Sequence, residues 1–99
     1  MGLDFIIHID NQRQVQFVMN EDLHSKIFSK STNWRSFKQL KKISDYYKTD
    51  AVFNSNELTT LIADLMQITQ QIDDFQDELQ QLITKLSQKN AKLLRVTSD

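Results

Sequence analysis

The feature that most constrains this chain is a heptad pattern in its C-terminal part. From Leu58 onward an apolar residue returns at alternating steps of three and four, with no glycine or proline in between. The residues of this seam are Leu58, Leu61, Leu65, Ile68, Ile72, Phe75, Leu79, Leu82 and Leu86. A stripe this narrow and regular is typical of a helix that another helix covers. The pattern therefore predicts a helix interface built from these residues.

The seam fits either one long helix or two short ones. A continuous helix over residues 57–88 is about 48 Å long at about 1.5 Å per residue, whereas a domain of this size is roughly 30–35 Å across. Its outer half would expose an apolar stripe, which marks an interface. The alternative is a helical hairpin that breaks near residues 70–74, with Asp73 or Asp74 as the second N-cap. Because no glycine, proline or asparagine marks a break there, we expect the continuous helix.

Charges beside the seam predict the direction of pairing. The heptad g positions are acidic at the start, with Glu57 and Asp64, and basic at the end, with Lys85 and Lys92. An antiparallel mate brings g positions side by side, so that Asp64 meets Lys85 and Glu57 meets Lys92. We therefore expect an antiparallel mate, supplied by a second copy, by another protein or by the chain's own second half.

Alternation of period two predicts two strands near the N-terminus. In residues 3–9 and 15–19 an apolar side chain recurs at every second position, and the polar run 10–13 between them suits a hairpin turn. The expected core face holds Leu3, Phe5, Ile7, Ile9, Val15, Phe17 and Met19. A lone hairpin is only marginally stable, so helices should cover this face.

Two short helices are expected to provide that cover. Asn20 is a candidate N-cap for the first, with acidic residues in the following turn. Asn33 is a candidate cap for a second helix over residues 34–47. We expect residues 48–54 to form a loop, Ser55 or Asn56 to cap the C-terminal helix, and residues 96–99 to form a frayed tail.

These elements predict a single α+β domain. Residues 1–56 form a globular part with the β-hairpin and two short helices, and residues 57–95 form the heptad helix, which packs on it and extends to a partner. A length of 99 residues allows one modest core. There is no cysteine, and no segment is long and apolar enough for a signal peptide or a membrane span. We therefore expect a cytoplasmic protein that does not enter membranes.

The residues that carry chemistry do not form a catalytic pattern. Gly2 is the sole glycine, which nearly excludes phosphate-binding loops. His8 and His24 lack the spacing of a zinc motif. The acidic run from Asp73 to Glu78 spreads over solvated helix positions. We therefore expect no catalytic residue, no metal, no cofactor and no enzymatic activity.

Two surfaces are candidates for contact with a partner: a basic and aromatic one over residues 34–47 and an acidic one over residues 73–78. Basic and aromatic side chains mix over residues 34–47, and a similar mixture binds nucleic acid in some proteins. The simpler interpretation, which we prefer, is a solvated basic face beside core aromatic residues. The candidate surface residues are Trp34, Arg35, Lys38, Lys41, Lys42, Tyr46, Asp73, Asp74, Asp77 and Glu78.

The preferred function is non-catalytic protein binding by a homodimer that associates through its C-terminal helix. In size, lack of cysteine and segregated charge, the chain is similar in general character to small bacterial immunity proteins, antitoxins and phage-encoded inhibitors. That similarity implies an inhibitor or immunity role and assigns no residue. One alternative is a small dimeric nucleic-acid-binding regulator that uses the basic helix 34–47, and another is a structural subunit of a larger assembly.

Overall fold

The structure, a computed structural model, describes residues 2–10 and 12–98. These residues form an α+β fold with four strands, four α-helices and one 3₁₀ turn. The strands are β1 (Leu3–His8), β2 (Gln14–Met19), β3 (Asp50–Asn54) and β4 (Leu93–Ser98). The helices are α1 (Glu21–Ile27), the 3₁₀ turn η1 (Trp34–Ser36), α2 (Lys38–Lys41), α3 (Ser55–Thr69) and α4 (Gln76–Leu86).

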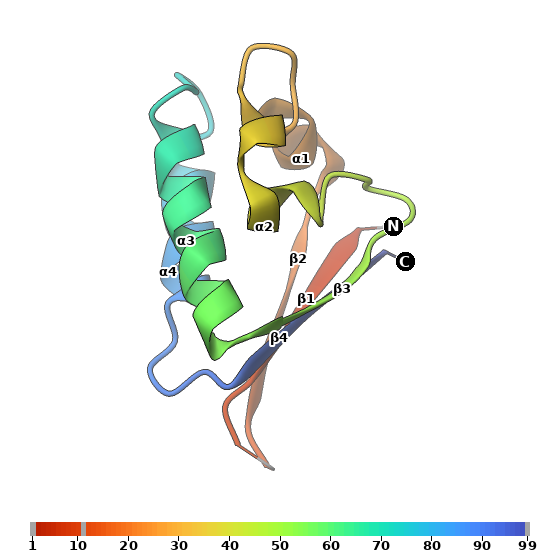
Figure 1. Cartoon of the computed structure of the whole chain (residues 1–99), viewed down its shortest axis with the longest axis vertical. Helices are drawn as coiled ribbons and strands as arrows, with labels where there is room; N and C mark the ends of the chain where they lie inside the picture. Colours follow the sequence, from red (N-terminus) through yellow and green to blue (C-terminus); the bar gives the residue numbers. More distant parts are fainter. Residues whose placement is uncertain (1, 11, 99) are drawn as a thin grey trace.

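The strands form one antiparallel sheet in the order β2-β1-β4-β3. The first and last strands of the chain are therefore neighbours at its centre, and β2 and β3 are its edges (Figure 1). The predicted hairpin is confirmed, because Phe5 pairs with Phe17 and Ile7 with Val15. Asn11 of the predicted turn lies outside the described residues.

All the helices lie on one face of the sheet (Figure 1). On β1, Leu3, Phe5 and Ile7 point under the helices and are buried, whereas the residues between them are only half-buried. The uncovered side, here named the open face, carries Asp4, Ile6, His8, Gln14, Gln16, Val18, Asp50, Val52, Asn54, Leu93, Arg95 and Thr97. The protein therefore has two layers, with the core between helices and sheet.

The predicted continuous C-terminal helix is wrong, and the hairpin alternative is confirmed. Helix α3 ends at Thr69 and α4 begins at Gln76. The side-chain amide of Gln76 donates to the carbonyl oxygen of Thr69 at 3.3 Å and to that of Ile72, and so ties the start of α4 to the end of α3 and to the turn between them. Phe75, rather than Asp73 or Asp74, is the N-cap and adopts a left-handed conformation with φ of 60°. These interactions break the helix without glycine or proline.

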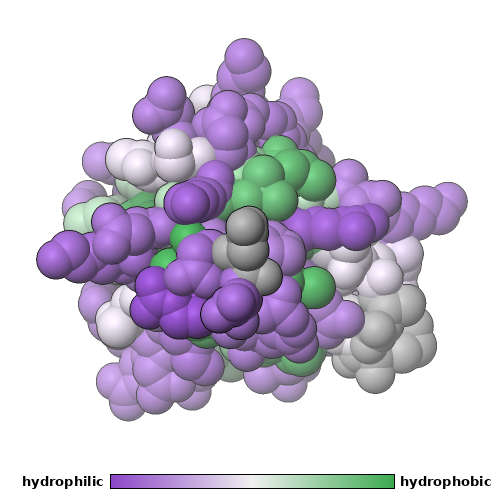
Figure 2. Space-filling model, turned by 90° about the horizontal axis from the view of Figure 1, so that it is seen from below, coloured by the Kyte–Doolittle hydropathy of each residue, from purple (hydrophilic) through white to green (hydrophobic). Residues whose placement is uncertain are grey.

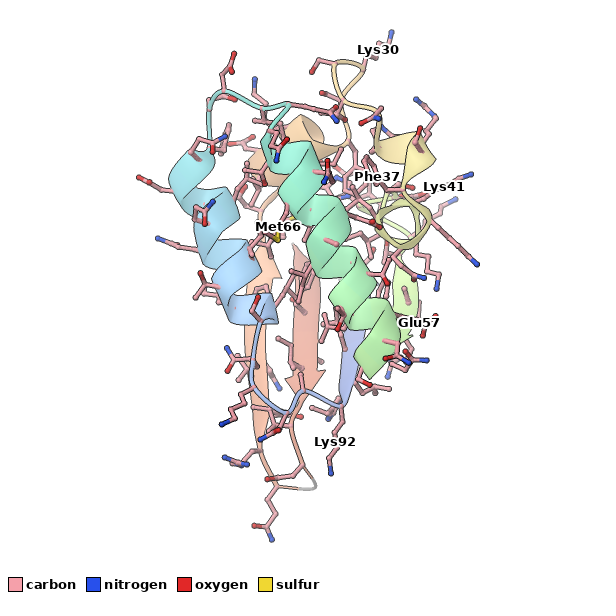
Figure 3. All side chains as sticks on the ribbon, turned by 60° about the vertical axis from the view of Figure 1, so that its left-hand side comes forward. Lys30, Phe37, Lys41, Glu57, Met66 and Lys92 are labelled. Carbon is pink, nitrogen blue, oxygen red and sulfur yellow. The ribbon has the colours of Figure 1, made fainter. Side chains whose placement is uncertain are left out.

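The heptad seam is buried within a single chain. All of its residues are buried except Phe75, which is half-buried. Figure 3 shows α3 and α4 side by side over the sheet. Because the two helices cover each other's apolar stripe and the sheet, no half of the seam overhangs the domain. The expectation that this seam extends to a partner is therefore wrong, because the chain covers it itself.

Three further expectations about the backbone are wrong. Residues 34–47 form only η1 and α2, because the Asp45 carboxylate accepts the N–H groups of Tyr47 and Lys48 and closes a turn instead. The expected loop 48–54 contains β3, and the expected tail from Val96 onward belongs to β4. Both strands form through pairing with distant parts of the chain. Asp99 lies outside the described residues.

Of the predicted N-caps, Asn20 is confirmed, whereas the Asn33 side chain makes no capping hydrogen bond at the start of η1. The Asn20 side chain accepts the N–H of Leu23 at 2.9 Å, as expected for α1. Helix α3 is capped by Asn54 rather than by Ser55 or Asn56. Asn54 and Glu57 form a reciprocal capping box, in which each side chain accepts the other's backbone N–H, at 2.8 and 3.0 Å.

Candidate protein-binding edge

Strand β2 is an edge strand without the usual protection. Its sequence, Gln-Val-Gln-Phe-Val-Met, contains no charge and no proline. Its pairing with β1 continues without a break from Gln14 to Met19. Edge strands usually carry charges, prolines or bulges, because their unpaired backbone groups can accept another strand. The other edge, β3, carries Asp50, which pairs with Arg95 at 3.5 Å, and it ends directly at α3.

The hydrogen-bond pattern identifies which backbone groups of β2 face outward. The N–H of Ile9 donates to the Arg13 carbonyl oxygen at 3.1 Å, which makes residues 9 and 13 a hydrogen-bonded pair. Such pairs alternate along antiparallel strands, so every second residue of β2 bonds to β1. The residues whose N–H and C=O groups point away from the sheet are therefore Gln14, Gln16 and Val18.

A groove runs beside this edge, between β2 and α4, with a volume of about 140 Å³. One side comes from the end of β2 and the start of α1, and the other comes from α4. The lining residues are Phe17, Val18, Met19, Asn20, Leu23, Glu78, Gln81, Leu82 and Lys85. Met19, Leu23 and Leu82 are buried and give the groove an apolar floor, whereas Val18 at its rim is 61% exposed. The edge groove, as we name it, combines free backbone groups with an apolar pocket.

The charges of the edge groove lie at opposite ends. Glu78 and Lys85 are both exposed and lie two helical turns apart on α4. The Lys85 ammonium lies 5.3 Å from the centre of the Phe17 ring, a cation–π contact. Neither Glu78 nor Lys85 forms an ion pair with another described residue. Both charges therefore remain available to a partner.

Most residues of the predicted basic surface lie on or beside α2. Lys38, Lys41 and Lys42 are exposed, and Lys41 extends outward from α2 in Figure 3. Lys42 is bound to Glu57 by an ion pair of 3.1 Å. The expected pairing of Glu57 with Lys92 is therefore wrong, since α3 starts beside α2.

The aromatic part of that surface is mostly structural. Trp34 is half-buried, packs edge-on against Phe28 at 5.4 Å between ring centres, and is covered by the Arg35 guanidinium at 4.3 Å. Tyr46 is buried, and its hydroxyl donates to the Met19 carbonyl oxygen at 3.4 Å. The prediction that Tyr46 belongs to an exposed patch is therefore wrong.

The acidic candidates lie on α4 and on the turn before it. Asp73, Asp74 and Asp77 are exposed, and Asp74 pairs with Lys26 at 3.1 Å. Only Glu78 of this group borders the edge groove. The buried carboxylate of Asp64 accepts the Leu40 N–H, so the expected pair with Lys85 is also wrong.

The two histidines have different surroundings. His24 is buried, and its Nε2 donates to the Ile43 carbonyl oxygen at 2.9 Å. Burial lowers the pKa of His24 below its ordinary value of 6.5, although the hydrogen bond to Ile43 partly opposes this. His8 is half-buried on the open face. Within the described ranges, no three histidine or carboxylate side chains gather as metal ligands would.

Two further observations describe the rest of the molecule. Seen from the end that carries the β1–β2 turn, the molecule is mostly hydrophilic, with small and separate hydrophobic areas (Figure 2). No helix among residues 2–10 and 12–98 has the length and apolar character needed to cross a membrane. We take the edge groove as the candidate site because it joins outward backbone groups of β2 to an apolar floor.

Sequence reasoning found β2 as a strand but missed its position at the edge of the sheet. Local alternation shows that residues 14–19 are extended, yet it does not show which strand lies at an edge. That position depends on β4, which pairs with the other side of β1 from the far end of the chain. Comparison of the chain with family models, with curated proteins and with solved structures gave no match.

Proposed function

We propose that this protein is a non-catalytic protein-binding module that takes an extended protein segment onto the edge of β2. The observation that carries the proposal is the uncharged, unbroken edge strand with the backbone groups of Gln14, Gln16 and Val18 turned outward. In strand addition, backbone hydrogen bonds give affinity and pockets for alternate side chains give specificity. The edge groove supplies both parts.

The groove supports this function through its apolar floor. Every second side chain of an added strand would point toward the helices, onto Met19, Leu23 and Leu82. Full burial of one such apolar side chain contributes about 1.5–3 kcal/mol. Glu78 and Lys85 then select for charges at either end of the segment.

Two matched proline variants test the edge. Val18 and Val52 are exposed by 61% and 51% and lie on opposite edge strands. Because Ser98 donates to Thr49 at 2.8 Å, the same alternation turns the Val52 N–H outward too. Val18→Pro and Val52→Pro therefore each remove an outward N–H and no internal hydrogen bond.

The probe is a library of random linear peptides, panned on the immobilised full chain. We expect segments with alternating apolar residues that bind the wild type and Val52→Pro but not Val18→Pro. On binding, the amide hydrogens of Gln14, Gln16 and Val18 should gain protection from exchange. Peptides that bind all three proteins equally, or a library that yields no binder, would contradict the proposal. Thermal melting of both variants confirms that they fold.

A further inference from the structure

We propose that the segment that occupies the edge groove is β2 of a second copy of this chain. Two β2 strands then pair antiparallel about a two-fold axis, and the two sheets join into one sheet of eight strands. This inference rests on the proposed function, because it names the occupant of the same edge. Three observations carry it.

The first is the position of Val18. A two-fold axis at Val18 places this residue opposite Val18 of the second copy, where the two exchange N–H···O bonds. It also covers an apolar side chain that is 61% exposed in the single chain. On the helix side the same register sets Phe17 opposite Met19 of the second copy. Each contact is then made twice, as a two-fold interface requires.

The second is the charge pattern of α4. Glu78 and Lys85 lie symmetrically about Gln81 and Leu82 within the groove-lining part of the helix. An antiparallel pair of α4 helices centred there sets Glu78 of each copy against Lys85 of the other. Two charges without an ion-pair partner among the described residues thus find each other. A surface that is complementary to itself fits a second copy better than an unrelated partner.

The third observation is that a single two-fold axis can relate both the two β2 strands and the two α4 helices. Helix α4 runs down toward the β1–β2 turn while β2 runs up toward α1 (Figure 1), and Lys85 lies against Phe17. The groove takes residues 17–20 from the sheet side and 78–85 from α4. The midpoints of these two segments, near Val18 and near Gln81, therefore lie at the same level. Strand pairing and helix pairing do not compete.

Sedimentation velocity of the full chain over a wide concentration range tests the inference. We expect the wild type to reach twice the 11.7 kDa of one chain. Val18→Lys should remain monomeric at the same concentrations, because it places a charge at the centre of the interface. Val52→Lys, the matched control on the opposite edge, should dimerise like the wild type.

A charge swap on exposed residues provides a second test that does not touch the core. Glu78→Lys should weaken the dimer by about tenfold or more, because two ion pairs become two repulsions. The double variant Glu78→Lys with Lys85→Glu should restore the dimer, since the swapped charges pair again across the axis. High salt should reduce both effects.

The outcomes separate this inference from the function on which it rests. A wild type that stays monomeric, or a dimer that neither Val18→Lys nor the charge swap affects, would overturn self-pairing. If library peptides still bind the β2 edge in that case, the protein-binding function stands with another occupant. If neither peptides nor a second copy uses this edge, both proposals fail.

Discussion

The Asp64 carboxylate caps a helix other than its own. Its Oδ2 accepts the backbone N–H of Leu40 at 3.2 Å, and both residues are buried. Leu40 is in the first turn of α2, where N–H groups have no partner within the helix. The N-cap residue of α2, Phe37, has no side-chain oxygen to accept them. Asp64 on α3 therefore completes α2 and joins the two helices.

Replacement of Asp64 tests this link. Asp64→Leu leaves the buried Leu40 N–H without an acceptor and should lower the free energy of unfolding by about 1–3 kcal/mol. Asp64→Asn keeps an oxygen in the same place and should lose clearly less. Urea denaturation followed by circular dichroism measures both. Equal losses for the two variants would show that the hydrogen bond is not what stabilises this position.

His24 makes stability depend on pH. Burial lowers the pKa of His24 in the folded protein, so at mildly acidic pH the unfolded chain binds more protons than the folded one. Stability should therefore be full above the ordinary pKa of 6.5 and should decrease as the pH falls through the lowered pKa of the folded state. In His24→Gln, an amide that can still donate to Ile43, this part of the pH dependence should disappear. Chemical denaturation at several pH values measures it, and an unchanged pH slope would contradict the assignment.

Much of the helical core could be predicted from the sequence, but not how the helices divide. The heptad seam identified residues that are buried, from Leu58 to Leu86. One long helix and an antiparallel hairpin bury the same stripe, so periodicity does not distinguish them. The break depends on the Gln76 amide and on the left-handed Phe75, neither of which is a residue type that normally ends a helix.

The sheet and the candidate site show the same limit. The β1–β2 hairpin is local and is predictable from alternation, whereas β4 pairs with β1 from the far end of the chain and β3 is held only by β4. Val52 and Phe53, or Leu94 and Val96, do not by themselves make a strand pattern. Because the edge position of β2 follows from where β4 inserts, the candidate site could not be predicted without the topology.

Glu57, a partly exposed carboxylate, should make stability depend on pH in a more acidic range than His24 does. The hydrogen bond from the Asn54 N–H, followed by that from the Lys42 ammonium, lowers the pKa of Glu57 below 4.5. Its contribution should therefore be present above pH 4.5 and should be lost as the pH falls through the lowered folded value. Glu57→Gln should flatten the stability curve in this range. A curve as steep as that of the wild type would refute the prediction.

The capping box that contains Glu57 should be sensitive at its other residue. Asn54→Ala removes the oxygen that accepts the Glu57 N–H at 2.8 Å, and it should cost about 1 kcal/mol. Asn54→Ser retains a capping oxygen and should cost less. Thermal unfolding of both variants at neutral pH measures the difference. If alanine and serine are equally tolerated, the cap does not stabilise α3.

Leu79 distinguishes the intramolecular hairpin from a long intermolecular helix. Its side chain is fully buried in the core of the single chain. Leu79→Ala should lower the free energy of unfolding by about 2–5 kcal/mol, and Leu79→Asp should unfold the domain. Gln80→Asp, one position along on the exposed side of α4, is the matched control and should leave stability nearly unchanged. Denaturation combined with sedimentation velocity separates loss of folding from loss of association. In a long self-associating helix, Leu79→Asp would yield a folded monomer, and that result would contradict both the hairpin and the assignment of the seam to the core.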